Sequence, residues 1–321
     1  MILAIGNSGI HEVEAFQSVV TALQSRGVNK VVLFRQDKCL ESDFLVYQAN
    51  ATGVRYDVVI DSTPYCIDDF TGIWYLKPHL PKELLLLEPG EYRQMVNRQF
   101  QEMRHALRTL FRDKKWVNDP WAEAIAENKL LQLKVATDLG FSIPPTLVTS
   151  DPDRVRAFFY QQSGGVIMKL LAPAMIMNNV MYTNRLSEEA LAGIDRIKQA
   201  PAIFQGYVEK AYELRITVVG DKIFAAKIDS QVDPETAVDW RRKPRLNDTD
   251  LKMSSVTLPS DVEARLFKLV AKLGLRFGCI DMIVSPSGDY IFLEINPNGQ
   301  WYFVQLRTQA RIAEAIADLL V

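Results

Sequence analysis

The sequence has 321 residues, of which 48% are apolar and 24% are charged, and its formal net charge is −2 with a pI near 6.0. This length predicts two or three domains, and the composition is that of a globular protein with a full core. The small net charge excludes the strong basic field that is typical of nucleic-acid-binding proteins.

Cysteine, histidine and hydropathy patterns narrow the class further. Three cysteines without a CxxC pair argue against a disulfide framework and for a reducing compartment. Three scattered histidines lack the spacing of a zinc site. The apolar run at residues 1–5 is too short for a signal peptide, and no run reaches the roughly 20 apolar residues of a membrane span. We therefore expect a cytoplasmic protein that binds neither nucleic acid nor a membrane.

Residues 1–117 predict an N-terminal α/β domain. An apolar run at residues 1–5, a segment with apolar residues at helical spacing, and a second apolar run within residues 28–37 form a βαβ pattern. This pattern favours a parallel sheet. Residues 56–61 and 72–78 are typical of two further strands.

A long charged helix is predicted over residues 82–113. Its apolar side chains recur at helical spacing. They are expected to form a buried stripe made of Met95, Phe100, Met103, Leu107 and Leu110. A stripe that binds a partner is the alternative interpretation.

A central domain is expected over residues 118–200. Asp119-Pro120 predicts a break or a helix start, and one helix is expected over residues 122–139. The run "GGVIMKLL" predicts a short strand that carries Lys169.

A C-terminal domain is expected over residues 201–321. Gly220-Asp221 predicts the turn of one hairpin, and residues 286–289 predict the turn of a second hairpin between two apolar strands. A final helix is expected to start near Thr308.

The strands of the second hairpin carry polar side chains in apolar surroundings. Asp281 lies on the first strand, and Glu294 and Asn296 lie two residues apart on the second, so all three can share one face. A buried carboxylate costs several kcal/mol unless it is paired or metal-bound. An all-oxygen set suits Mg²⁺. Carboxylates that cap a sheet edge or pair with surface lysines are the alternative.

Two lysines and an arginine are candidates for binding phosphate. Lys169 ends an apolar strand, and Lys129 lies on a helix, where each is either a phosphate clamp or a side chain whose stem lies along apolar surface. Arg241 lies in "DWRR", and arginine suits a forked grip on phosphate or carboxylate. A surface basic cluster is the alternative for that motif.

The segment "FQGYVEKAYELR" combines a connecting strand with a charged pair. Residues 205–208 can present backbone groups to an adenine edge. Glu213 and Arg215 share a strand face, either as an acid that binds ribose and an arginine that binds phosphate, or as a simple salt bridge.

In this order, the motifs resemble those of an ATP-grasp ligase from Asn118 to the C-terminus. The stretches "ENKLLQLKVATDLGFSIPPTLVT", "ELRITVVG", "VDWRR" and "IFLEINPNGQW" are similar to the microviridin-type (graspetide) maturases of ribosomally synthesised and post-translationally modified peptides (RiPPs). The resemblance implies an ATP-grasp fold of the α/β (α+β) class, with an N-terminal α/β domain, a central lid domain and a C-terminal domain. It implies ATP and Mg²⁺ as cofactors, bound between the last two domains.

The implied reaction has two steps. ATP phosphorylates an Asp or Glu carboxylate of a precursor peptide, which consists of a leader and a core. A Ser or Thr hydroxyl or a Lys amine of the same peptide then attacks the acyl phosphate. The product is a macrocyclic ester or amide, with ADP and phosphate released. The family resemblance also implies a homodimer.

The resemblance carries over residue by residue. Mg²⁺ ligands are implied at Asp281, Glu294 and Asn296. Catalytic roles are implied for Arg215 and Arg241, which would hold the γ-phosphate and the acyl phosphate. The implied ATP-binding residues are Lys129, Lys169, Gln205, Gly206, Tyr207, Val208, Glu213, Arg241 and Asn296.

Alternatives remain open for one loop and for the function. The loop "LLAPAMIMNNVMYTN" lacks the glycines of many ATP-grasp lids, and its Met175, Met177 and Met181 either contribute to a leader groove or pack within the lid. A ligase that adds a free amino acid to a carboxylate, and a non-catalytic nucleotide-binding protein, are the competing functions.

Overall fold

The structure is a computed structural model of the chain, and it describes residues 1–172, 175–176, 179–180, 183–234, 236–242 and 252–321. Within these residues, no helix is both long enough and apolar enough to cross a membrane.

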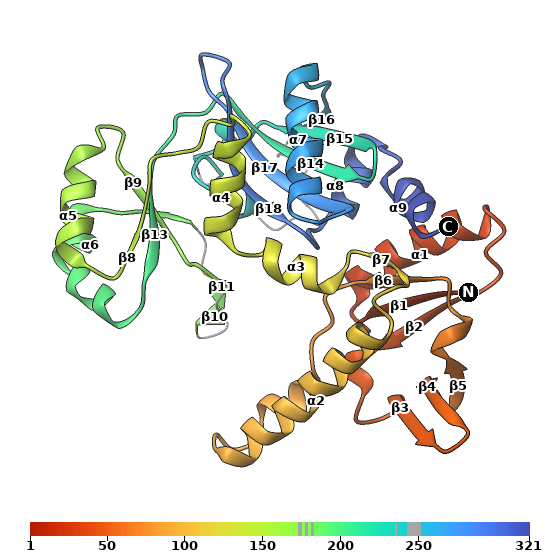
Figure 1. The fold of residues 1–321 in the computed structure, drawn as a ribbon. Coiled ribbons are helices and arrows are strands. Elements are labelled where there is room, and N and C mark those ends of the chain that lie inside the picture. Colours follow the sequence, from red (N-terminus) through yellow and green to blue (C-terminus); the bar gives the residue numbers. More distant parts are fainter. Residues whose placement is uncertain (173–174, 177–178, 181–182, 235, 243–251) are drawn as a thin grey trace.

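The N-terminal part is built on a four-stranded parallel sheet in the order β2-β1-β6-β7 (Figure 1). Its strands are β1 (Ile2–Gly6), β2 (Val31–Arg35), β6 (Gly72–Tyr75) and β7 (Lys115–Val117). Helix α1 (Ile10–Gln24) packs on one face of this sheet and helix α2 (Glu91–Leu110) on the other. The predicted βαβ start with parallel strands is confirmed.

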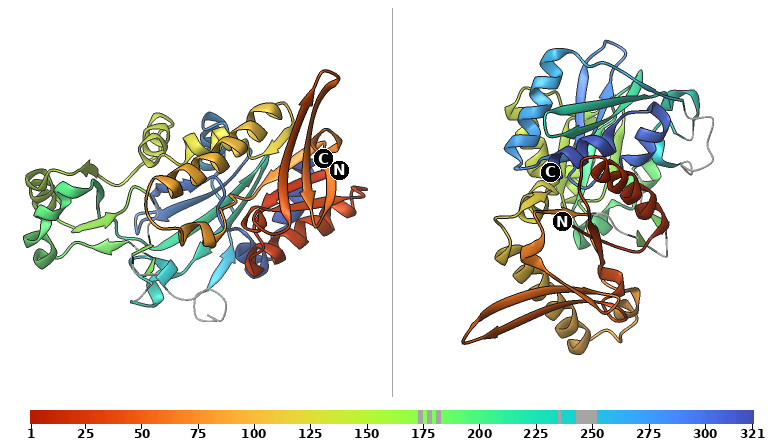
Figure 2. Two further views of the ribbon diagram at one scale, coloured as in Figure 1. Left: turned by 90° about the horizontal axis from the view of Figure 1, so that it is seen from below. Right: turned by 90° about the vertical axis from the view of Figure 1, so that its right-hand side faces the viewer.

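An antiparallel sheet of three strands stands out from this domain as a long ribbon (Figure 2). It consists of β3 (Asp43–Asn50), β4 (Gly53–Ile60) and β5 (Thr63–Cys66). Short 3-10 helices flank it at η1 (Gln36–Lys38) and η2 (Ile67–Asp69), and η3 (Lys82–Leu85) precedes α2. The sequence predicted only the second of the three strands.

The predicted buried stripe of α2 is confirmed only in part. Leu107 is buried and Met103 is partly buried against the sheet, but Met95 is 46% exposed and Leu110 is 50% exposed. Helix α2 projects beyond the sheet, so only part of it has a core to pack against (Figure 1). Its start is also later than predicted, because residues 86–90 separate it from η3.

The helix predicted over residues 122–139 is two helices, α3 (Pro120–Ala126) and α4 (Lys129–Asp138). The break occurs because the Asn128 side chain accepts hydrogen bonds from the backbone N–H groups of Leu130 and Leu131, which caps a new helix. Lys129 thereby becomes the first residue of α4 instead of a mid-helix residue.

The central part is an antiparallel sheet in the order β12-β9-β13-β8, packed on helical segments. Its strands are β8 (Thr146–Thr149), β9 (Val166–Lys169), β12 (Asn184–Arg185) and β13 (Ala202–Gly206), and its helices are α5 (Pro152–Gln161), α6 (Glu188–Ala192) and η4 (Ile194–Gln199). A short hairpin, β10 (Met175–Ile176) and β11 (Asn179–Val180), extends from it. Met177 and Met181 of the predicted methionine-rich loop lie outside the described residues. Because β13 pairs with β8 and β9, we propose that the boundary predicted after residue 200 lies after residue 206.

The C-terminal part is a five-stranded antiparallel sheet in the order β16-β15-β14-β17-β18. Its strands are β14 (Tyr212–Val219), β15 (Lys222–Ile228), β16 (Met253–Ser255), β17 (Phe277–Val284) and β18 (Tyr290–Asn296). One face packs on α3, α4 and α7 (Ser260–Lys272), and the other packs on α8 (Tyr302–Thr308) and α9 (Ile312–Leu320). Both predicted hairpins are confirmed.

Two helices stand where the sequence predicted one near Thr308. Helix α8 ends there because Gln309 adopts a left-handed conformation with φ of 56°, and α9 then begins at Ile312. Helix α9 shares one core cluster with α1 and the N-terminal sheet. The C-terminus is therefore anchored on the N-terminal domain, which places the two domains in direct contact (Figure 1).

Candidate active site

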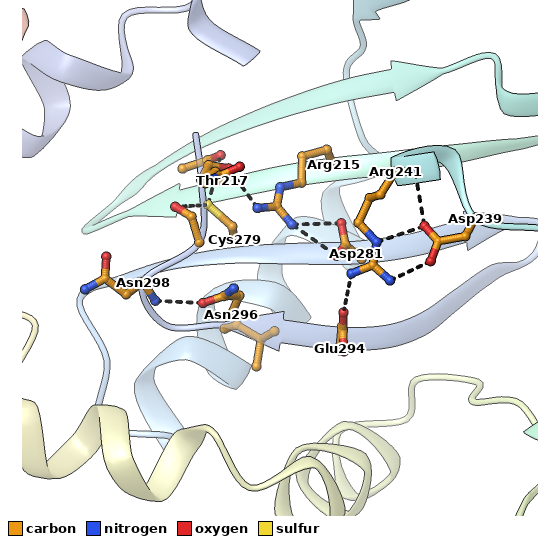
Figure 3. A network of polar contacts seen from close by, with 12 residues as sticks. Arg215, Thr217, Asp239, Arg241, Cys279, Asp281, Glu294, Asn296 and Asn298 are labelled. Atoms are coloured by element: carbon orange, nitrogen blue, oxygen red, sulfur yellow. Dashed lines mark hydrogen bonds and ion pairs between the residues drawn. The ribbon is translucent and has the colours of Figure 1, made fainter. Parts of the chain in front are cut away.

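The predicted metal residues lie on neighbouring strands β17 and β18. Asp281 and Glu294 are direct cross-strand partners, next to a bulge between Asp281 and Met282. Asn296 pairs with Cys279 two residues further along β18 (Figure 3). Directly opposite residues of an antiparallel pair project from the same face. The strand pattern thus brings the two carboxylates together, with the amide one pleat further.

Cations surround both carboxylates. The Arg215 Nη1 atom lies 3.0 Å from each Asp281 oxygen. Glu294 accepts a hydrogen bond from Lys129 Nζ, and Arg241 Nη1 lies 3.6 Å from its other oxygen. Burial alone would raise the pKa of Glu294, but the charges of Lys129, Lys169 and Arg241 lower it to about 2. Glu294 is therefore ionised at neutral pH.

A glycine allows Arg215 to reach this position. A Cβ atom on Gly299 would lie 2.9 Å from Arg215 Nη2 and 2.5 Å from Cys279 Cβ. Arg215 Nη2 also donates to the backbone carbonyl of Gln300 at 2.7 Å. The glycine of the "EINPNG" motif is thus required by close packing, and the loop after β18 holds the guanidinium in place.

Arg241 is oriented by a carboxylate that the sequence interpretation passed over. Its Nε and Nη2 atoms donate to the two Asp239 oxygens at 2.8 and 2.9 Å (Figure 3). Asp239 is buried, and although burial raises the pKa of this carboxyl, the bonds to Arg241 lower it below its ordinary value. The pair fixes the direction of the Arg241 fork.

A cavity with an empty volume of about 580 Å³, part of it open to solvent, lies between the central and the C-terminal sheets. Its walls contain eight of the predicted site residues: Lys169, Gly206, Tyr207, Val208, Glu213, Arg241, Asp281 and Glu294. Four predicted residues are not among its lining residues: Lys129, Gln205, Arg215 and Asn296. Lys129 and Arg215 contact the cavity's carboxylates instead, and Asn296 is an exposed residue whose Oδ1 accepts from the N–H of Asn298.

The connecting strand at the cavity is tied to the central sheet by its backbone. The N–H groups of Gly206 and Tyr207 donate to the carbonyls of Pro145 and Gly165. An adenine edge at this hinge would therefore have to use the carbonyls or the N–H of Val208. The Gln205 side chain is buried, and its Oε1 atom has no hydrogen-bond partner.

Glu213 and Arg215 do not form the salt bridge considered from the sequence. Glu213 instead accepts from Lys210 at 2.7 Å, and both side chains are buried. Burial raises the pKa of Glu213, and the Lys210 charge opposes this shift. Lys210 was missed because a lysine between turn residues in "VEKAY" carries no signal that it is buried.

Two buried amides hold the loop and strand that carry the metal candidates. Gln132 on α4 donates to the Ile295 carbonyl at 2.8 Å and accepts from the Ile295 N–H at 3.1 Å. Asn118 donates to the carbonyls of Phe277 and Pro297 at 2.8 and 2.7 Å. Both were missed, although an amide inside an apolar helical pattern at position 132 is a weak signal of such a role.

The chemistry of the donor set bears on metal binding. Within the described ranges, no three His, Cys, Asp or Glu residues are grouped so that they could hold a metal ion. The candidate set thus rests on two carboxylates and one amide. Such a set suits a cation that completes its shell with water and phosphate oxygens, as Mg²⁺ does.

Comparisons with known proteins bear on the class of the protein. No protein-family model matches the chain. It is 23% identical, over 90% of its length and 94% of the relative's, to a probable alpha-L-glutamate ligase of Shewanella loihica.

Solved structures give a closer match. A RiPP-associated ATP-grasp ligase of Chryseobacterium gregarium, in complex with ADP and a leader and core peptide, is 28% identical with a TM-score of 0.86, over 99% of this chain and 96% of that one. The macrocyclase MdnC of Microcystis aeruginosa, bound with precursor peptide MdnA, is 28% identical with a TM-score of 0.85, over 99% and 98%. The predicted fold class and resemblance are confirmed: this chain is an ATP-grasp ligase, and it is similar to the RiPP-associated enzymes of that class.

Proposed function

We propose that the chain uses ATP and Mg²⁺ to activate Asp or Glu side chains of a ribosomal precursor peptide as acyl phosphates. It then joins them to Ser or Thr hydroxyls or Lys amines, which closes macrocyclic esters or amides. The observation that carries this proposal is the pair of cross-strand carboxylates, Asp281 and Glu294, set among cationic side chains at the wall of the 580 Å³ cavity. The relatives solved with precursor peptides support a peptide as the substrate.

The side chains present fit Mg²⁺. Asp281, Glu294 and the Asn296 amide oxygen are hard oxygen donors, and the two carboxylates are adjacent. Bound there, Mg²⁺ would offset the negative charge of the nucleotide phosphates. A solved relative with 20% identity, PsnB, is complexed with Mg and ADP.

The protein's own cations supply the rest of the electrostatics. The Lys169 side chain faces the cavity, and burial lowers its pKa. Arg241 also lines the cavity, and Asp239 holds it in a fixed orientation. The substrate carboxylate attacks the γ-phosphorus and ADP leaves, so charge spreads over the transferring oxygens, where fixed cations stabilise it.

The second step needs no nucleophile from the protein. The acceptor oxygen or nitrogen of the peptide attacks the acyl carbon, and phosphate leaves. Arg215 and Arg241 are proposed to hold the phosphate group during this displacement. Across both steps the peptide loses one water for each cross-link.

A second candidate function is the addition of free glutamate to a carboxylate, as the names of relatives that are 23% and 24% identical suggest. The two functions differ in product mass, because cross-linking removes water whereas ligation adds an amino-acid residue. Intact mass spectrometry of the peptide product separates them.

The test uses the full chain, ATP, Mg²⁺ and a Thr/Asp/Glu-rich peptide encoded beside its gene. Glu294→Gln should abolish ADP release and peptide dehydration, because the neutral amide removes a carboxylate that faces the cations. Glu14→Gln, an exposed change on α1, is the matched control and should retain activity. Undiminished ADP release by Glu294→Gln would refute the metal assignment.

The homodimer implied by the resemblance is part of the proposal. Size-exclusion chromatography with light scattering tests it, and a monomer at micromolar concentration would contradict it.

A further inference from the structure

A second cavity lies in the N-terminal domain, away from the one already described. It lies at the carboxyl ends of the parallel strands β1, β2 and β6. In the sheet order β2-β1-β6-β7, the next strand after β1 is added on one side of β1, and the later strands β6 and β7 are added on its other side. In open α/β sheets, ligands bind outside the carboxyl ends of strands at such a reversal.

Two arginines reach this cavity from one face of α2. Arg104 and Arg108 are one helical turn apart, and both line the cavity. Arg108 donates to the Tyr75 hydroxyl, and its guanidinium lies 4.8 Å from the Tyr75 ring centre. Burial lowers the pKa of Arg104.

These arginines differ in their partners from Arg35, Arg215 and Arg241. Arg35, Arg215 and Arg241 each contact an aspartate at 3.0 Å or less. Within the described part of the chain, neither Arg104 nor Arg108 has a carboxylate within the 4.0 Å of an ion pair. Their positive charge therefore remains available to an anion from outside the chain.

A further polar group of the cavity is an acceptor. Gln36 is only 3% exposed, and its Oε1 atom has no hydrogen-bond partner. A buried polar atom without a partner is costly unless a ligand or an ordered water supplies a donor. An acidic residue within a peptide offers both complements, a carboxylate for the arginines and a backbone N–H for Gln36.

Tyr75 connects this cavity to the active centre. Its hydroxyl contacts Arg108, while its backbone carbonyl accepts from Asn298 Nδ2 at 2.9 Å in the loop that follows β18. We propose that the cavity binds the carboxylate of an Asp or Glu residue of the substrate peptide other than the one being activated. This anchors the peptide beside the β18 loop, and the role in peptide anchoring rests on the proposed function.

A binding experiment tests the site without requiring turnover. The probe is N-acetyl-glutamate N-methylamide, with the glutamine analogue as its neutral control, titrated into the full chain and followed by NMR. We expect the Arg104→Gln/Arg108→Gln variant to bind the acidic probe at least tenfold more weakly than the wild type, because two charge-assisted bonds are lost. Arg98→Gln, an exposed change on the same helix, should leave the affinity unchanged. Equal affinity in the double variant and Arg98→Gln would overturn the proposal.

A second variant separates binding from folding. Gln36→Met keeps the side-chain volume but removes the unpartnered amide oxygen, so the melting temperature should hold or rise while probe affinity falls. A purely structural Gln36 would give a lower melting temperature with unchanged probe affinity, which would count against the site.

Peptide kinetics distinguish this proposal from the proposed function. With a precursor peptide that is cross-linked, the double arginine variant should raise the peptide KM about tenfold, with nucleotide affinity unchanged. An unchanged KM would overturn the anchoring role while the proposed function stands. If no peptide is modified, the proposed function fails, and the probe titration alone decides whether the cavity binds carboxylates.

Discussion

Replacing Gln132 by methionine tests how the active-site strand is held. Strand β18 is the edge of its sheet, so the Ile295 N–H and carbonyl on its open side lack a strand partner. The Gln132 amide takes that place and also donates to the Ala126 carbonyl at 2.6 Å. Methionine keeps the volume and leaves one N–H and two carbonyls unpaired in a buried place.

The expected cost follows from these three groups. Each unsatisfied buried group costs about 1–3 kcal/mol, so the free energy of unfolding should fall by about 3 kcal/mol or more. At roughly 2–4 °C per kcal/mol, the melting temperature should fall by about 6–12 °C. Because Glu294 and Asn296 flank Ile295, their displacement should also lower turnover on the order of 100-fold.

The assay combines thermal unfolding with ADP release at saturating ATP. Gln17→Met, an exposed change on α1, is the matched control. If Gln132→Met melts within 1–2 °C of that control, about the shift expected for less than 1 kcal/mol, then Gln132 does not hold the edge of β18.

Two further predictions concern buried charges. Lys210→Met should lower the free energy of unfolding by about 3–5 kcal/mol, because it leaves the Glu213 carboxylate buried without its partner. Denaturant titration measures this loss, with the exposed change Lys198→Met as the control. A loss no larger than that of the control would contradict the prediction. Burial raises the pKa of Glu123 from 4.5 to about 8. The protonated form therefore contributes its full stabilisation below pH 4.5, and this stabilisation is lost as the pH rises through 8. The melting temperature of the wild type should therefore fall relative to that of Glu123→Gln between pH 5 and pH 9, and parallel curves for the two proteins would refute the shift.

The sequence predicted those parts of the site that a single strand pattern determines. Two polar residues at spacing two on one strand and a carboxylate on the neighbouring strand predicted that all three can share one face. The register agrees with this prediction, and it adds that Asp281 lies directly opposite Glu294. The fold class followed from motif order, and the solved relatives confirm it.

What the sequence did not predict depends on tertiary contacts. Asn118 and Gln132 look like ordinary polar positions until the strand edge and the loop that they bond are in place. Asp239 and Lys210 gain their roles from Arg241 and Glu213, the partners that the fold brings next to them. The prediction that the whole α2 stripe is buried was wrong at its exposed residues for the converse reason. Helical periodicity indicates an apolar face of a helix, but it does not indicate whether another element covers that face.

The central claim is that the chain cross-links carboxylates of a precursor peptide at the expense of ATP. Its most direct test is the intact mass of the peptide after incubation with the full chain, ATP and Mg²⁺, with release of ADP measured in parallel. The proposal predicts the loss of one water per ADP released, and no loss with Glu294→Gln. A gain of one glutamate residue per ADP, or ADP release with an unchanged peptide, would contradict it.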